Sequence, residues 1–131
     1  MADVDITNVD VSALETMTEL ALDAATEDTI DTAQKFVITP DAYKQFERCA
    51  IVVKEANGAG NLSFSLAAGD YYWASGKALT GSVTSSKTMV MVVESAKYKN
   101  SDGKMELTLT PASGKKLKTD HGAEVGFIEL F

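Results

Sequence analysis

Apolar and polar residues alternate with a period of two over most of the chain beyond residue 34. Leu62, Phe64 and Leu66 alternate with small polar residues, and residues 105–110 repeat the pattern. Such alternation is typical of strands that place one face on a core and the other in water, as in antiparallel sheets. Segments rich in Val, Ile, Phe and Met predict further strands at residues 34–39, 48–54, 87–94 and 124–130.

Turn residues separate these predicted strands. Residues 57–60, Asn-Gly-Ala-Gly, tolerate positive φ angles and predict a hairpin, and residues 100–103 predict a second turn of this kind. Pro40 and Pro111 end two strands at places where a missing N–H is harmless. Seven or eight short strands without a long helix predict one all-β domain, an antiparallel β-sandwich or jelly roll.

The first 31 residues differ in charge from the rest of the chain. The chain has a formal net charge of -7, and residues 1–31 contain nine acidic side chains and no Lys or Arg. We therefore divide it into an acidic N-terminal arm, residues 1–31, and a β-sandwich domain, residues 32–131. Ser12 and Glu15 have capping-box spacing, which favours a short helix at residues 12–25 that orders on a surface; a frayed terminus is the alternative.

The arm is also a candidate binding segment. An acidic chain does not have the clustered bases that general nucleic-acid binding needs, so we expect a protein partner rather than DNA or RNA. The candidate contact residues are apolar: Val4, Ile6, Val9, Val11, Leu14, Met17 and Leu20.

Compartment signals are few. The N-terminus has no basic region followed by an apolar stretch, and the longest strongly apolar run is about five residues, so we expect no signal peptide and no membrane span. Cys49 is the single cysteine and lies in an apolar stretch, which predicts a buried, inert thiol and excludes an internal disulfide.

No catalytic or metal-binding pattern is present. His121 is the only histidine; it follows Asp120 in a polar segment, and we predict an exposed loop residue. No Gly-x-Ser-x-Gly motif accompanies it, and one Cys with one His cannot form a zinc site. We therefore expect a protein that is not an enzyme and needs neither cofactor nor metal.

Two further segments are candidates for binding. Tyr71, Tyr72 and Trp73 lie in a predicted loop between Gly69 and Gly81; exposed, they would stack on a sugar or a protein, and otherwise they fill the end of the sandwich. Residues 97–118 contain six lysines, which either meet an acidic surface, including the arm of a neighbouring copy, or protect strand edges.

The span from Ala33 to Phe131 resembles small proteins that tailed bacteriophages and Gram-positive prophages encode close to their major capsid protein. The most distinctive part is the Glu-Ser-x-Lys-aromatic pattern at residues 94–98, followed by Asp102-Gly103. The other matching segments are residues 34–40, 51–58, 66–71 and 125–130.

This resemblance implies a capsid decoration (auxiliary head) protein. Such a protein would be made in the bacterial cytoplasm, bind the major capsid protein on the outer surface of the virion, and stabilise the head; a homo-oligomer on the lattice fits the same role. We expect the arm to lie along a neighbouring capsid subunit. The alternatives are a glycan-binding or receptor-binding sandwich of a tail fibre or surface adhesin, which would use residues 71–73, and a tail or neck protein of similar fold.

Overall fold

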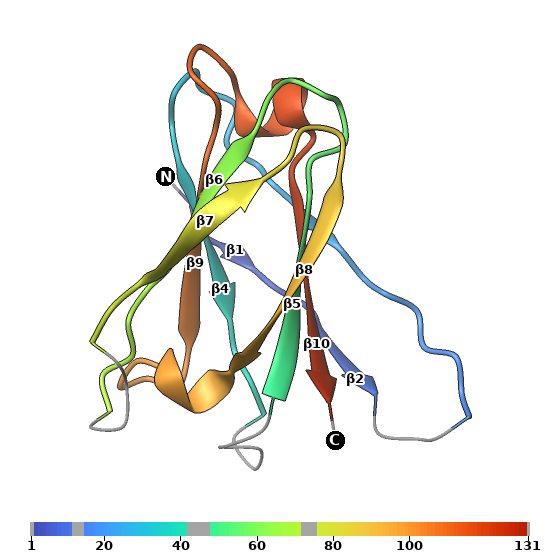
Figure 1. The fold of residues 1–131 in the computed structure, drawn as a ribbon, viewed down its shortest axis with the longest axis vertical. Helices are drawn as coiled ribbons and strands as arrows, with labels where there is room; N and C mark the ends of the chain where they lie inside the picture. The colour runs from blue at the N-terminus through green and yellow to red at the C-terminus, as the bar shows by residue number, and fades with distance from the viewer. Residues whose placement is uncertain (1, 12–14, 42–47, 72–75, 131) are drawn as a thin grey trace.

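The alternating segments form two facing β-sheets in a computed structural model that describes residues 2–11, 15–41, 48–71 and 76–130 (Figure 1). Sheet A contains, in spatial order, β1 (Val4–Asp5), β4 (Gln34–Ile38), β9 (Met105–Thr110), β6 (Leu62–Leu66) and β7 (Leu79–Val83). Sheet B contains β2 (Asn8–Val11), β10 (Glu124–Leu130), β5 (Arg48–Lys54) and β8 (Thr88–Glu94), with β3 (Asp23–Ala24) paired to β10. Two short helical turns follow β8 and precede β10: η1 (Ser95–Lys97) and η2 (Leu117–His121). The prediction of an all-β sandwich is confirmed.

The core lies between the sheets and is made by the period-two alternation. In β9, Met105, Leu107 and Leu109 are fully buried, and Leu107 is paired with the buried Phe36 of β4. Phe127 of β10 is also fully buried, on the facing sheet. Each such large side chain contributes about 1.5–3 kcal/mol when it leaves water, so this alternation is the main source of stability.

Six predicted strands are confirmed, but the predicted hairpin at residues 57–60 is wrong. Gly58 and Gly60 do have positive φ angles, as the turn chemistry requires. However, β5 pairs with β8 and β10, whereas β6 pairs with β7 and β9, so the turn carries the chain from sheet B to sheet A. Residues 100–103 likewise form a turn between β8 and β9, which lie in different sheets.

The first 31 residues add three strands that the sequence did not predict. β1 runs parallel to β4, and β2 runs parallel to β10, so both sheets are mixed rather than purely antiparallel. Ile6, between β1 and β2, is buried in the core as the chain passes from one sheet to the other. The acidic composition changes near residue 31, but the packing continues across that point.

The short helix expected at residues 12–25 is not formed in its described part, residues 15–25. Residues 16–22 lie outside regular structure, and β3 follows them. A Cβ atom on Gly126 would come within 2.6 Å of Leu22 and 3.5 Å of Leu20. Residues 20–22 therefore lie over the outer face of β10, and we call the segment of residues 16–22 the strap. Leu20 and Leu22 pack there from a chain without helical structure, whereas Met17 is fully exposed.

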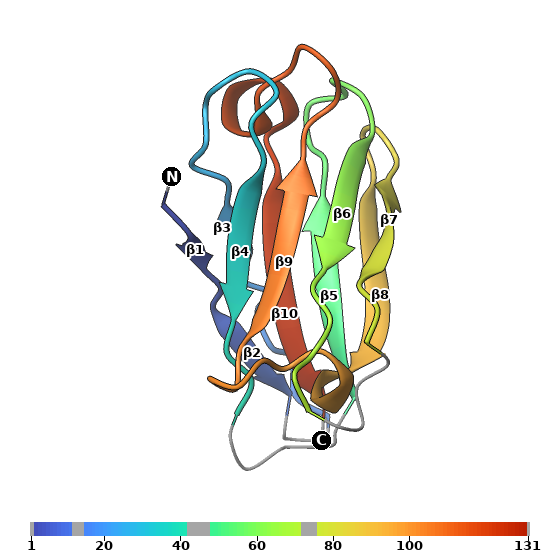
Figure 2. The same ribbon diagram turned by 90° about the vertical axis from the view of Figure 1, so that its left-hand side faces the viewer.

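The two long sides of the sandwich differ in whether a segment of the chain bridges the two sheets. On one side, residues 4–11 edge both sheets and bridge them through Ile6. On the other side, β7 and β8 are the last strands of their sheets, and both lie at the same edge of the sandwich in Figure 2. An apolar groove of about 170 Å³ lies between them.

Candidate functional site

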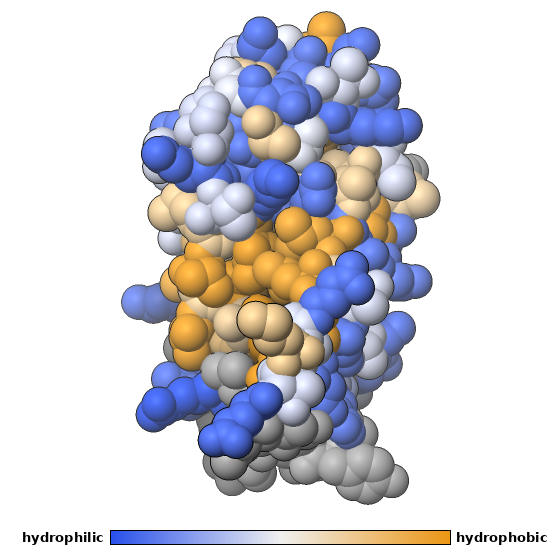
Figure 3. Space-filling model, turned by 90° about the vertical axis from the view of Figure 1, so that its right-hand side faces the viewer, coloured by the Kyte–Doolittle hydropathy of each residue, from blue (hydrophilic) through white to orange (hydrophobic). Residues whose placement is uncertain are grey.

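The outer face of sheet B carries an apolar surface. Even-numbered residues of β8 point away from the core, and Val90 and Val92 are 63% and 60% exposed. Val90 is paired with Val52 of β5, and Val92 with Ala50, so the four side chains form two adjacent rows. Leu20 and Leu22 of the strap and Ile128 of β10 continue these rows. We call this surface the sheet B patch, and Figure 3 shows it as an apolar area with hydrophilic residues above and below.

The strap lies over this face at Gly126, which is paired with Val52 of β5. Ala50 and Val52 are only 7% and 5% exposed, although they lie outside the core between the sheets. Leu20, at the strap end of the patch, is 42% exposed. The face is therefore covered at Gly126 of β10 and exposed at Val90 and Val92 of β8, and neighbouring exposed apolar side chains of this kind often mark a contact site.

The sequence-predicted arm contacts are divided by the structure. Val4 and Val11 are half-buried; Ile6 and Val9 are buried within the chain's own sandwich and cannot act as surface contacts in this fold. Met17 is fully exposed. Among these predicted contacts, Leu20 joins the patch, and Leu14 lies outside the described residues.

The sequence prediction missed Val90 and Val92 as site residues, although a signal for them exists. Residues 89–93, Met-Val-Met-Val-Val, are apolar without interruption. In a strand, successive residues face opposite sides, so an unbroken apolar run predicts two apolar faces. A strand of this kind is covered on both sides or exposes one apolar face.

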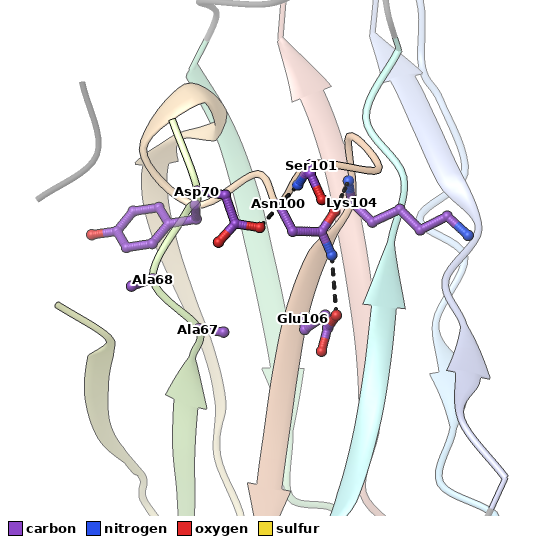
Figure 4. A pocket seen from close by; sticks show the side chains of 8 residues that line it. Ala67, Ala68, Asp70, Asn100, Ser101, Lys104 and Glu106 are labelled. Carbon is purple, nitrogen blue, oxygen red and sulfur yellow. Dashed lines mark hydrogen bonds between the residues drawn. The ribbon is translucent and has the colours of Figure 1, made fainter. Parts of the chain in front are cut away.

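A polar pocket of about 280 Å³ lies near one end of the sandwich (Figure 4). Asp70 accepts a hydrogen bond from the Ser101 N–H at 3.0 Å, and the Asn100 amide donates to Glu106 at 3.1 Å. The lining also includes the side chains of Lys104 and Tyr98 and two alanines, Ala67 and Ala68.

Hydrogen bonds to the backbone fix the shape of this pocket. The side-chain oxygen of Asn100 accepts hydrogen bonds from the backbone N–H groups of Asp102 and Lys104. These two bonds hold the turn before β9 in place. Gly69 approaches the backbone of Lys97 so closely that a Cβ atom would lie 2.6 Å from its carbonyl oxygen. The aromatic candidate Tyr71 is half-buried beside the pocket-lining Asp70, whereas Tyr72 and Trp73 lie outside the described residues.

His121 is fully buried, so the prediction of an exposed loop histidine is wrong. Its Nδ1 lies 2.9 Å from a carboxylate oxygen of Glu55, and its Nε2 accepts from the Ala112 N–H at 3.0 Å. Because that backbone group can only donate, Nδ1 carries the proton and donates to Glu55. The ring is closed off from solvent and has a structural role. The neighbours of His121 in sequence are polar and therefore predict exposure. Its burial instead arises from contacts with residues that are distant in sequence, such as Glu55.

Glu55 is the centre of this buried cluster. Its carboxylate accepts from the N–H groups of Gly58, Ala59 and Ser86 at 2.8–3.0 Å, in addition to His121. Burial by itself would raise the pKa of Glu55, but these hydrogen bonds, the one from Ser86 first, together hold it below its ordinary value. The cluster joins the loops at this end of the sandwich.

Part of the basic segment contacts the acidic arm of the same chain. Asp28 accepts hydrogen bonds from the backbone and side chain of Thr119, and Gly114 N–H donates to Asp31 at 2.6 Å. The Thr119 hydroxyl, with smaller contributions from Lys116 and Lys118, lowers the pKa of Asp28. The acidic surface that this part of the segment meets is therefore in the same molecule.

Cys49 is buried, which confirms its prediction. Burial, with a smaller contribution from the Glu129 charge, raises the pKa of its thiol to about 12, so the reactive thiolate is not formed near neutral pH.

Comparison with known proteins gives no match: no family model, no curated protein and no solved structure matches the chain. None of the helices in the described ranges is long and apolar enough to span a membrane. The described residues also contain no group of three or more His, Cys, Asp or Glu side chains placed to hold a metal ion.

Proposed function

We propose that this chain is a non-enzymatic virion structural protein, a capsid decoration protein that binds the major capsid protein on the outside of a tailed-phage head. The observation that carries the proposal is the sheet B patch, an exposed apolar face on a sandwich whose core is already complete. A contact of this kind, rather than a catalytic site, is what an assembly protein requires. The sequence resemblance supplies the identity of the partner.

The structure changes the expected mode of binding. Residues 4–11 are part of the sandwich, so the contact passes to the patch and the strap, where Leu20, Val90 and Val92 reach solvent. One patch is a small interface, but many copies on a repeating shell would each add binding energy to the lattice. Binding only the expanded shell would stabilise that state by mass action.

The proposal is tested by binding to undecorated heads. Leu20→Lys places a charge on the patch without touching the core, and Ile30→Lys makes the same change at a 52% exposed residue in the loop before β4. We expect Leu20→Lys to lose co-sedimentation with heads and Ile30→Lys to keep it. Equal binding by both variants, or a wild-type protein found only in tails or absent from virions, would reject the proposal.

A second candidate function is glycan binding by a tail-fibre or adhesin sandwich. The polar pocket supports it, because a carboxylate beside an aromatic ring, here Asp70 and Tyr98, is suited to sugar hydroxyls and a sugar face. Glycan-array binding that is lost in Asp70→Ala, while head binding is absent from the wild type, would favour this function over capsid decoration.

A further inference from the structure

The side of the sandwich between β7 and β8 has two edge strands. In the part of the chain that the structure describes, β7 pairs only with β6, and β8 pairs only with β5. An edge strand presents a row of backbone N–H and C=O groups that can pair with another strand. Folded proteins usually protect such edges with Lys, Pro, bulges or a covering segment.

β8 has no such protection over most of its length. Residues 88–93 contain no charge and no proline, and Met89, Val90 and Val92 are 43%, 63% and 60% exposed. The register with β5 is continuous from Arg48–Glu94 to Lys54–Thr88, so no bulge interrupts the strand. β8 is therefore a seven-residue edge strand with five consecutive apolar residues, 89–93, and is ready to pair.

β7 is a poorer edge. It is five residues long, and its exposed positions include Thr80, Gly81 and Ser82. Gly81 lies under the ring of Phe64, where a Cβ atom would come within 2.8 Å of the ring. A glycine within a short polar strand adds little apolar area to a new pairing, so the two edges differ in kind.

An apolar groove runs beside β8 towards the core. It is lined by Met89 and Met91 of β8, Val83 of β7, Phe64 of β6, and Ile51 and Val53 of β5. Methionine side chains adapt to irregular neighbours. A strand added at β8 would thus find apolar contacts on both of its faces: the groove on one side and the sheet B patch on the other.

The charges at the two ends of β8 indicate what that strand is. Lys87 precedes the uncharged stretch, and Glu94 ends it. A second β8 in parallel would place Glu94 beside Glu94 and Lys87 beside Lys87, whereas an antiparallel copy separates these like charges to opposite ends of the pairing. With the two-fold axis at Met91, Val90 faces Val92 of the second copy, and Thr88, next to Lys54, faces Glu94 of the second copy.

We propose that β8 pairs antiparallel with β8 of a second copy across a two-fold axis at Met91. The pairing joins two B sheets into one continuous sheet and the two patches into one apolar face. It is an isologous contact, since the same strand acts on both sides and the assembly closes at two copies. The inference rests on the β8 edge and does not depend on the proposed capsid role.

The test uses complementary charges at Val90 and Val92. The double variant Val90→Lys/Val92→Lys puts Lys opposite Lys at both positions, and Val90→Glu/Val92→Glu puts Glu opposite Glu. Both side chains are exposed, so the sandwich itself remains folded. We expect a wild-type dimer in sedimentation equilibrium, a dimer Kd raised about 100-fold or more in each variant, and recovery of the dimer on mixing the two.

A matched control places the same lysines on the other edge. Thr80→Lys/Ser82→Lys changes two exposed residues of β7, and it should dimerise as the wild type does. Circular dichroism and the urea midpoint verify that each variant is folded. A monomeric wild type, a dimeric Lys variant, no recovery on mixing, or loss of the dimer in the β7 control would each overturn the proposal. A wild-type monomer that instead binds an extended peptide of another protein would assign the edge to that partner.

Discussion

At the scale of single residues, Glu55 and His121 show how one carboxylate orders several loops. The oxygens of Glu55 accept four hydrogen bonds, three of them from backbone N–H groups in the 57–60 turn and the β7–β8 loop. Both side chains are fully excluded from solvent. A buried N–H that loses its acceptor costs more than the bond itself contributed, so this cluster is sensitive to small changes.

Glu55→Gln tests that sensitivity. In either orientation the amide NH₂ of Gln would face two N–H donors, those of Gly58 and Ser86 or those of Ala59 and the His121 ring, so at least one bond is lost and a donor is left buried. We expect the free energy of unfolding to fall by about 1–3 kcal/mol at pH 7, measured by urea denaturation. Glu19→Gln, at an exposed strap residue, is the control and should change it little.

The wild type and Glu55→Gln should also differ in how their stability depends on pH, and the direction of that difference follows from the pKa of Glu55. The pKa of folded Glu55 lies below its ordinary value of 4.5, so the unfolded chain takes up a proton first as the pH falls. The stabilisation is complete above about pH 4.5 and is lost as the pH falls through the folded pKa. The difference in stability between wild type and Glu55→Gln should therefore narrow in acid. A constant difference down to pH 3 would contradict this account.

At the scale of elements, the strands that the sequence predicts are those with a strong local pattern. β6 and β9 alternate clearly, and β5, β8 and β10 are rich in Val, Ile, Phe and Met. β7 contains Gly81 and two small polar residues, so its local pattern is that of a loop, and its pairing with β6 makes it a strand. β1, β2 and β3 are two to four residues long and depend entirely on their partners.

The strap shows the limit of local patterns most clearly. The capping-box spacing of Ser12 and Glu15, just before the strap, favours a helix. Packing of Leu20 and Leu22 against Gly126 decides otherwise, and that contact joins positions about 100 residues apart in sequence. The patch was likewise only partly predictable: its β8 residues are visible in an unbroken apolar run, but the covering segment is not.

Gly126→Ala tests the seating of the strap. The added Cβ atom would lie 2.6 Å from Leu22 and 3.1 Å from the Ala21 carbonyl oxygen, so the strap must move away from β10. We expect a loss of about 1–3 kcal/mol in stability and faster proteolysis between residues 15 and 24. Adding Leu22→Ala should recover part of the loss by removing the nearer contact. Unchanged proteolysis of Gly126→Ala would show that the strap is not held there.

At the scale of the whole molecule, the N-terminal residues complete the sandwich. Ile6 and Val9 are 8% and 7% exposed, and β1 and β2 cover one edge of each sheet. An arm that only tethered the protein could be removed without effect on the domain. The packing instead makes these residues part of the structure that would be presented to a partner.

Removal of residues 1–11 should therefore destabilise the whole molecule. The loss of the two buried side chains alone corresponds to about 3–6 kcal/mol, and the newly exposed edge of β10 adds an aggregation risk. Urea denaturation and sedimentation velocity measure the two effects. A shorter deletion of residues 1–3, whose described members are exposed, should have a much smaller effect. A stable, monomeric protein without residues 1–11 would show that the arm is dispensable for folding.

The parallel pairing of β2 with β10 also has a consequence for synthesis. Residues 8–11 are synthesised before their partners, residues 127–130, and about 120 residues separate the two strands in sequence. Sheet B cannot acquire its outer strand until translation of the chain through residue 130 is complete, and contacts so distant in sequence form slowly. During that interval the edge of β5 that pairs with β10 has no partner, so sheet B can assemble only after β10 has been made.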